Sequence, residues 1–310
     1  MTLIADAPAL PTDPAPDAPG STRRRPRLPR RRRGEGRPPM AAAITSRRDR
    51  IVVYLVLGVL GVLWAFPMYA AIRKSLAVHG LRNYTSLISD PVGGISIPQT
   101  YLNSFIVGFL HATLVLAIAV PAGYAFSVLR WRGRELAFSL SLLFLAVPAA
   151  AMIVPVYRIS NQAGLFDTYL GVALPEAVIT VPFGVLLMRN FGRNVPASLV
   201  EAARVDGAGH VAVFRHLFLP LCRPALVNLI VLCFIWSIQD FMWPSIFIRE
   251  RGMQTAAQAV LSLNTGLGAS PTDIARYNAS LVVLAIPATV IVLLGMRFLV
   301  SGLTSGGVKE

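Results

Sequence analysis

Charged residues are scarce in this sequence. Only 14% of its 310 residues are Asp, Glu, Lys or Arg, whereas 55% are hydrophobic and the mean hydropathy is +0.60. Soluble globular domains carry about 25% charged residues, so a chain with this little charge would be hard to keep in solution. The composition argues against a soluble domain and indicates a membrane protein.

Residues that build disulfides, metal sites and catalytic sites are also few. The two cysteines, Cys222 and Cys233, lie near the edge of one expected span and inside it, which argues against a disulfide framework. A Walker A motif is missing, because Lys74-Ser75 lacks the glycines that would cradle a phosphate. The sequence predicts no catalytic residue, no metal, no cofactor of its own and no ATP hydrolysis. The four histidines show no ligand or nucleophile–base spacing and are expected on the surface or in packing: His79, His111, His210 and His216.

Acidic residues are outnumbered 15 to 29 by Lys and Arg, and much of the net charge of +14 lies before residue 51. We expect residues 1–50 to be a disordered cytoplasmic tail that orients the first span and contacts anionic membrane lipid. Nucleic acid is not an expected partner, because no aromatic residue interleaves the arginines. A twin-arginine export signal is disfavoured, because Pro26 and Arg27 stand where such a signal has a hydrophobic pair. The twelve arginines of the tail are Arg23, Arg24, Arg25, Arg27, Arg30, Arg31, Arg32, Arg33, Arg37, Arg47, Arg48 and Arg50.

Long apolar runs account for most of the remaining chain. A bilayer core about 30 Å thick needs about 20 apolar residues of helix, and six runs are long enough. The fold class expected is therefore all-α, a polytopic membrane protein with six transmembrane helices. Prolines interrupt the third and fourth runs and predict packed, kinked helices that still span: Pro148, Pro155, Pro175 and Pro182. The six runs cover about residues 51–72, 104–128, 137–157, 168–189, 225–248 and 278–301.

The distribution of basic residues predicts the orientation. The second connection carries Arg130, Arg132 and Arg134, and the fourth carries five arginines, whereas the third carries only Arg158. The first and fifth connections also hold basic residues but are longer and weigh less. We expect a multi-pass protein of the cell membrane with both termini in the cytoplasm.

A charged segment, residues 194–220, separates the fourth and fifth runs and would face the cytoplasm. Lipid would penalise its acidic and basic side chains heavily. Pro196 suits a first helical position, and Gly207 and Gly209 are expected to end this first helix in left-handed conformations. A second helix is expected over residues 211–218. Because a simple re-entry loop needs only a few polar residues, this helix–turn–helix indicates a docking surface.

The segment also carries a motif. Glu201-Ala202-Ala203 is followed after three intervening residues by Gly207, after nine more intervening residues by Leu217, and after one more by Leu219-Pro220. This resembles the EAA motif of the membrane subunits, or permeases, of ATP-binding-cassette (ABC) importers, with Leu217 in place of isoleucine. Over about residues 50–310 the chain is similar to the maltose-type carbohydrate permeases, through "GLFDTYLGVALP", "IWSIQDFMWPSIFI" and the ending "GLTSGGVK". It departs from them at Ile238 and Gln239, where tryptophan and asparagine are usual.

The resemblance implies a type I ABC importer permease fold over residues 51–310 and import of a mono- or oligosaccharide. It implies as partners a second permease subunit, two cytoplasmic ATPases that bind the ATP, and an extracytoplasmic solute-binding protein. Within the spans, Glu176, Gln239 and Asp240 are candidates for the substrate path, although a polar clamp between helices explains Asp240 equally well. The residues implied in coupling to the ATPase are Glu201, Ala202, Ala203, Asp206, Gly207, Leu217, Leu219 and Pro220.

Other functions remain open at this point. The resemblance alone favours sugar over a peptide, a polyamine or a phosphonate. A proton-driven secondary transporter would use Glu176 and Asp240 as its relay, and an assembly scaffold would only bind a partner through residues 194–220. The relay leaves the EAA motif unexplained.

Overall fold

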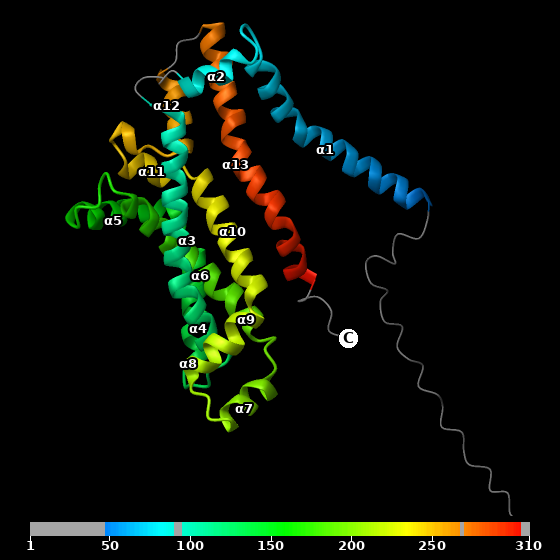
Figure 1. Ribbon diagram of the computed structural model, residues 1–310, viewed down its shortest axis with the longest axis vertical. Coiled ribbons are helices and arrows are strands. Elements are labelled where there is room, and N and C mark those ends of the chain that lie inside the picture. The colour runs from blue at the N-terminus through cyan, green and yellow to red at the C-terminus, as the bar shows by residue number, and fades with distance from the viewer. Residues whose placement is uncertain (1–46, 90–94, 267–269, 305–310) are drawn as a thin grey trace, which may run out of the picture. The chain divides into compact units, whose positions relative to one another are not determined.

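The computed structural model describes residues 47–89, 95–266 and 270–304 (Figure 1). The regular elements there are helices, which confirms the all-α class. The chain divides into two units between Leu60 and Gly61, and the division falls inside helix α1 (Arg47–Ser75). Of the expected basic tail, Arg47 to Arg50 form the first turn of α1; the rest lies outside the described residues.

Four helices are long and apolar enough to cross a membrane unbroken: α1, α3, α6 and α13. Two bent helix pairs bring the number of spans to as many as six. The α-helices after α1 are α2 (Arg82–Ser89), α3 (Ile97–Ser127), α4 (Arg134–Leu143), α5 (Ala149–Gln162), α6 (Tyr169–Gly192), α7 (Ala197–Val205), α8 (His210–Val213), α9 (Leu219–Leu221), α10 (Arg223–Gln239), α11 (Met242–Phe247), α12 (Ala256–Gly266) and α13 (Pro271–Thr304). A π-helical stretch, Phe214–Phe218, joins α8 to α9, and short 3-10 helices cover Phe144–Ala146 and Arg251–Met253.

The expectation of one kinked helix over residues 137–157 is wrong. The run is broken at Pro148, and the helices on either side, residues 134–146 and α5, are bent by 97°. Pro148 disfavours a helical conformation at the residue before it, and Val147 is accordingly extended with ψ 118°. The other three prolines, Pro155, Pro175 and Pro182, lie inside α5 and α6 as expected.

The expected fifth span, residues 225–248, is also interrupted. Helix α10 ends at Gln239, Asp240 is extended with ψ 128°, and α11 begins at Met242. The carboxylate of Asp240 accepts hydrogen bonds from the backbone N–H groups of Met242 (2.9 Å) and Trp243 (3.4 Å). Such capping of α11 competes with continuation of α10, so this Asp separates two helices.

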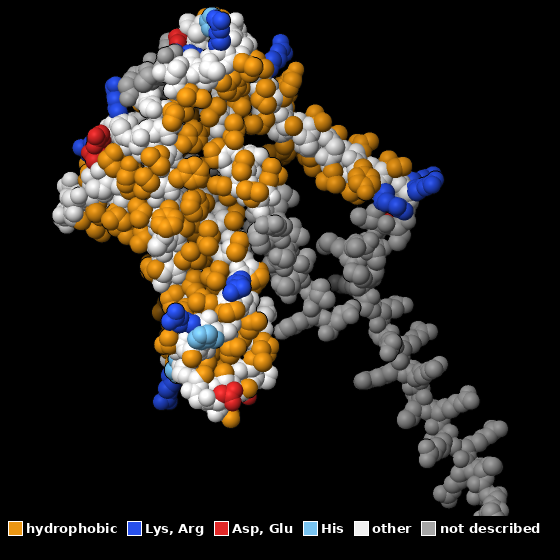
Figure 2. Space-filling model, viewed as in Figure 1, with side chains coloured by type: hydrophobic (Ala, Val, Ile, Leu, Met, Phe, Trp, Pro, Cys, Tyr) orange, Lys and Arg blue, Asp and Glu red, His pale blue; other side chains and the backbone are white. Residues whose placement is uncertain are grey.

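Helices α3, α6 and α10 form the core of the second unit, where they pack side by side (Figure 1). Small residues let α3 and α6 approach closely: a methyl group on Gly184 of α6 would lie 2.8 Å from Ala119 Cβ of α3. A methyl group on Gly123 of α3 would overlap Met188 of α6. Figure 2 shows hydrophobic side chains along these helices and charged side chains mainly toward their ends, a distribution suited to a multi-pass membrane protein.

Two polar contacts tie the connections together in pairs. Asp167, between α5 and α6, accepts hydrogen bonds from the backbone N–H groups of Arg249 (2.6 Å) and Glu250 (2.9 Å), which follow α11. Bonds from Glu250 and then Arg249 hold the pKa of the Asp167 carboxyl below its usual value. Glu135, which follows the second connection, pairs with Arg189 of α6. The connection between α5 and α6 therefore contacts the residues that follow α11. The start of α4 contacts the end of α6, just before residues 194–220.

Candidate functional site

The EAA stretch forms helix α7 and its C-terminal cap. The backbone N–H of Gly207 donates to Arg204 O (3.1 Å), and that of Ala208 donates to Ala203 O (2.8 Å), the two bonds of a Schellman motif. Gly207 has φ +82°, a left-handed conformation in which a side chain is strained. The spacing between Ala203 and Gly207 in the motif is therefore the spacing found where a helix ends in a Schellman motif. Gly209, by contrast, has φ −72° and caps the start of α8, so the expected left-handed role for it is wrong.

Residues 194–220, called the coupling segment here after the role that the resemblance implies, are fixed to α3 and α6. The ring of Tyr124 on α3 makes edge contacts with Phe214 and Phe218, both with centroids 5.2 Å apart, and its hydroxyl donates to His210 O (3.1 Å). Val213 and Phe218 are fully buried in the same core cluster as α3 and α6. These contacts make the segment a rigid continuation of the transmembrane core.

Arg189 anchors the end of α6 just before this segment. Its guanidinium is buried, pairs with Glu135 at the start of α4, and lies 3.6 Å from the centroid of the Phe138 ring. Its Nε donates to Phe126 O at the end of α3 (3.3 Å). The buried charge is thereby hydrogen-bonded and paired, as a charge removed from water requires. The Arg189 side chain thus joins α3, α4 and α6 at the ends that are expected to face the cytoplasm.

The outer face of the coupling segment is exposed and mixed in character. Glu201, Ala202, Asp206, Gly207 and Pro220 of the implied coupling residues are exposed. Ala203, Leu217 and Leu219 instead pack against the core, so they support the segment from within.

Two exposed valines complete this outer face, and the sequence analysis did not single them out. Val205 is 88% exposed and Val211 is 70% exposed, on either side of Gly207. Apolar side chains that stand out at a charged turn are typical of a protein-binding surface.

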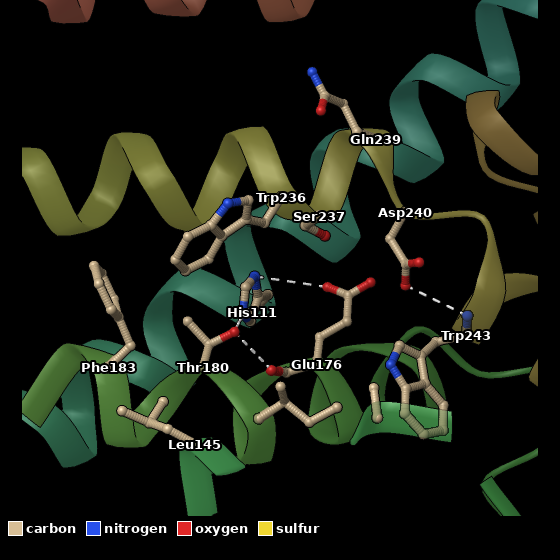
Figure 3. A pocket seen from close by; sticks show the side chains of 12 residues that line it. His111, Leu145, Glu176, Thr180, Phe183, Trp236, Ser237, Gln239, Asp240 and Trp243 are labelled. Atoms are coloured by element: carbon tan, nitrogen blue, oxygen red, sulfur yellow. Dashed lines mark hydrogen bonds and ion pairs between the residues drawn. The ribbon is translucent and has the colours of Figure 1, made fainter. Parts of the chain in front are cut away.

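A second candidate site is a cavity of about 510 Å³ between α6 and α10, with α3 forming its back wall (Figure 3). Aromatic and aliphatic side chains form much of its wall, and a few polar groups point into it, the composition usual for small-molecule sites. Its lining residues are His111, Leu145, Ala149, Glu176, Ile179, Thr180, Phe183, Trp236, Ser237, Gln239, Asp240 and Trp243.

Glu176 is the most buried acidic group of this cavity, with 6% of its surface exposed. Neither of its carboxyl oxygens has a hydrogen bond of normal geometry to any described residue. Oε2 lies 3.6 Å from Nδ1 of His111. His111 is held by bonds between Nδ1 and Cys233 O and between Nε2 and the Thr180 hydroxyl, both 3.1 Å. The carboxyl of Glu176 thus lies against a fixed ring, with Ser237 and Asp240 close by.

The three residues expected on the substrate path are only partly brought together. Glu176 and Asp240 line the same cavity, and the Asp240 carboxylate also caps α11. Gln239 touches the rim, but Figure 3 shows its amide directed away from Glu176 and Asp240. It also lines a second groove, between α10 and α13. Gln239 and Asp240 therefore do not point into the same part of the cavity.

His111 was expected on the surface or in packing, and Thr180 and Ser237 were not among the candidate site residues. All three face the cavity, and no motif in the sequence marked them. A helical projection of residues 169–192 would have placed Thr180 on the same face as Glu176, four residues away. No group of three or more metal-ligating side chains occurs in the part of the chain that the structure describes.

Comparisons with known proteins place these features in a family. Residues 115–301 match the family described as "Binding-protein-dependent transport system inner membrane component". The chain is 29% identical over 277 residues to the arabinooligosaccharides transport system permease protein AraQ of Bacillus subtilis (strain 168), covering 84% of this chain and 96% of AraQ. It is 32% identical over 269 residues to the sn-glycerol-3-phosphate transport system permease protein UgpE of Yersinia pestis bv. Antiqua (strain Antiqua), covering 81% and 94%.

A solved structure shares the fold. The crystal structure of a bacterial ABC transporter involved in the import of the acidic polysaccharide alginate matches with a TM-score of 0.70 at 22% identity, over 81% of this chain and 98% of that chain. The family match covers more than half of the chain and includes α6, the coupling segment and α10. The chain belongs to the family of inner-membrane components of binding-protein-dependent transport systems.

Proposed function

We propose that this chain is the permease subunit of an ATP-driven importer and couples to a cytoplasmic ATPase through residues 194–220. The observation that carries this is the coupling segment itself: an exposed face with Glu201, Val205 and Val211, mounted rigidly on α3 and α6. Closure of an ATPase on nucleotide must reach the membrane through a stiff contact. ATP is bound by the ATPase, and this chain adds no catalytic residue or cofactor.

The assembly proposed contains a second permease subunit, two ATPases and an extracytoplasmic solute-binding protein. The translocation path lies between the two permeases, so that this chain forms half of it, with Glu176 and Asp240 on its wall. The cargo proposed is a mono- or oligosaccharide. The relatives' names support it, because arabinooligosaccharides, sn-glycerol-3-phosphate and alginate are all rich in hydroxyl groups.

A proton-driven transporter is the second candidate, because the buried Glu176 lies beside His111 and near Asp240. Such a relay gives no role to the exposed face of the coupling segment. A scaffold uses that face but not the cavity. Only an ATP-coupled permease uses both.

The deciding experiment is uptake into liposomes that contain this chain with its partner permease, both ATPases and the solute-binding protein. We expect uptake of the sugar bound by the solute-binding protein to require ATP on the side of the liposome membrane that carries the ATPases. This uptake should persist when the proton gradient is collapsed. Uptake that follows the proton gradient without ATP would establish the relay instead. Stable binding of the ATPase without any uptake would support the scaffold function.

Topology gives an independent prediction, with both termini in the cytoplasm. Cysteines in place of Gly133 and Gly209, both exposed, should react with an impermeant thiol reagent only from the cytoplasmic side, and one in place of exposed Ala163 only from outside. The natural cysteines, Cys222 and Cys233, are free and buried and serve as the unreactive background. Labelling of Gly209→Cys from outside would contradict the orientation. A probe expected outside at Gly94 falls outside the described residues.

A further inference from the structure

The cavity between α6 and α10 presents acidic groups without basic ones. Glu176 and Asp240 both line it, and none of its described lining residues is Lys or Arg. The one cationic candidate, His111, has both ring nitrogens engaged, with Cys233 O and the Thr180 hydroxyl. It therefore offers no free N–H to an entering anion.

Several buried polar atoms of this cavity lack a hydrogen bond of normal geometry. Both carboxyl oxygens of Glu176 and the hydroxyl of Ser237 are buried without a hydrogen bond of normal geometry to any described residue. Ser237 and Asp240 lie close enough to interact with the Glu176 carboxyl, so the three side chains form one polar group on the wall. Ser237 is 3% exposed and lies on α10, opposite Glu176 on α6 (Figure 3). Buried polar groups are nearly always hydrogen-bonded, so unsatisfied ones on a cavity wall are suited to a ligand. A carboxyl group and a hydroxyl on facing walls match the donors and acceptors of a polyol.

Aromatic side chains supply the apolar part of the wall. Trp236 is 42% exposed and makes an edge contact with Phe183, with ring centroids 5.2 Å apart. Trp243 closes the other side of the cavity. Its backbone N–H donates a hydrogen bond to the neighbouring Asp240 carboxylate. A flat, partly exposed aromatic face beside fixed polar groups can orient a ring-shaped solute with mixed polarity.

Charge then decides which polyols fit. An anion would lose its water shell among apolar walls and meet two carboxyl groups with no counter-charge, and an unpaired buried charge is strongly unfavourable. An ammonium group also loses its water shell, but pairing with the carboxyl groups of Glu176 and Asp240 offsets that cost, and a neutral hydroxyl carries no charge to desolvate. We propose that this cavity accepts neutral or amino-bearing polyols and excludes acidic ones, an inference that rests on the proposed function and narrows its cargo. It sets this chain apart from relatives named for sn-glycerol-3-phosphate and alginate, both of which are anionic.

The charge preference can be measured without knowing the cargo. Leu145 lines the cavity and is 45% exposed, so a Leu145→Cys variant of the complete transporter carries a thiol at its wall. Two methanethiosulfonate reagents of similar size are compared, one with a cationic ethylammonium group and one with an anionic ethylsulfonate group. The rate at which each reagent modifies the cysteine is divided by its rate of reaction with β-mercaptoethanol in solution. The matched control is Leu293→Cys, 63% exposed in the groove between α10 and α13, whose described lining residues include no acidic side chain.

We expect the cation-to-anion rate ratio to be at least about tenfold higher at Leu145→Cys than at Leu293→Cys. Adding Glu176→Gln and Asp240→Asn to Leu145→Cys should remove most of that difference. Equal ratios at the two positions, or a ratio that the two neutralising changes leave unaltered, would overturn the charge preference.

Uptake of three sugars of one ring type separates this inference from the proposed function. Glucose, glucosamine and glucuronate are offered in excess as competitors of the natural cargo in ATP-driven uptake. Competition by glucose or glucosamine with at least about tenfold weaker competition by glucuronate supports the inference, once the preference of the isolated solute-binding protein for the same three sugars has been divided out. Stronger competition by glucuronate would overturn it while leaving ATP-driven sugar import intact. Loss of ATP dependence would instead remove the proposed function, and the thiol rates would still report the charge of the cavity.

Discussion

Reversing the charge of Glu201 is expected to lower ATPase association by about a hundredfold and to stop transport. The Glu201→Lys side chain replaces an attractive contact at the docking face with repulsion. Glu201 is exposed, and it contacts neither the cavity nor an expected lipid-facing surface. The variant should therefore insert and pair with its partner permease normally. Co-purification of the ATPase with the variant, at several ATPase concentrations, measures the loss.

Gly207→Val tests the same face through the backbone. Gly207 has φ +82°, and a β-branched residue is strongly disfavoured there, so the Schellman turn should shift and move Val205 and Val211 off the ATPase. The matched control for charge is Glu250→Lys, an exposed glutamate on an expected external connection, which should leave association unchanged. An acidic substitution on the ATPase should partly restore Glu201→Lys. Wild-type association and transport by both Glu201→Lys and Gly207→Val would mean that residues 194–220 do not couple the two proteins.

The other large effect is expected at the contact between α3 and α6. A methyl group at Gly123 would overlap the Cβ of Met188 and lie 3.0 Å from its backbone carbonyl carbon, so the two helices must separate. Overpacking of this kind costs about 1–3 kcal/mol. We expect Gly123→Ala to lower the thermal midpoint of the detergent-purified protein and Gly123→Leu to abolish the monodisperse folded species, as followed by size-exclusion chromatography after heating.

Two other glycines calibrate this result. At Gly108 a methyl group would lie 3.2 Å from the ring of Phe234, a side chain that can rotate away, so Gly108→Ala should cost less than Gly123→Ala. At Gly61 nothing lies within 4 Å, and Gly61→Ala should be neutral or stabilise α1 by up to about 1 kcal/mol. Equal midpoints for all three alanine variants would contradict the close approach of α3 and α6.

The sequence predicted the class of the fold and the coupling turn because both depend on local patterns. Apolar runs of spanning length predict membrane helices, and a glycine, which adopts the left-handed cap without penalty, predicts a helix ending. Gly209 shows the limit of that reasoning: two nearby glycines fit the same role, and only the closed hydrogen bonds to Ala203 and Arg204 assign it to Gly207.

Breaks inside apolar runs were not predictable from hydropathy. Pro148 and Pro155 look alike in the sequence, yet Pro148 begins a new helix and Pro155 lies within one. The choice depends on whether neighbouring helices can satisfy the freed carbonyl groups, which is a tertiary property. Asp240 likewise ends α10 because its carboxylate finds two N–H groups in α11.

The cavity was the least predictable feature. Glu176 stood out, because a carboxyl group in a span needs a reason. His111 and Ser237 did not, since they lie 65 residues before and 61 residues after Glu176 and meet it only when α3, α6 and α10 pack together. Gln239 follows directly on Ile238 and precedes Asp240, yet the helix turns its amide to the opposite side.

The close fit of α3 against α6 has a mechanical consequence. Helices in contact through glycines cannot slide past each other without lifting apart, and Arg189 binds their ends to α4. The pair therefore acts as a stiff lever, with the docking face at one end and the cavity wall part of the way along. Helix α6 has 24 residues and is about 36 Å long, so a tilt of about 5° at its far end displaces the docking face by about 3 Å. Small angular strokes of an ATPase would thus suffice to tilt the whole wall of the path, with no helix unwinding and no side chain relaying the motion.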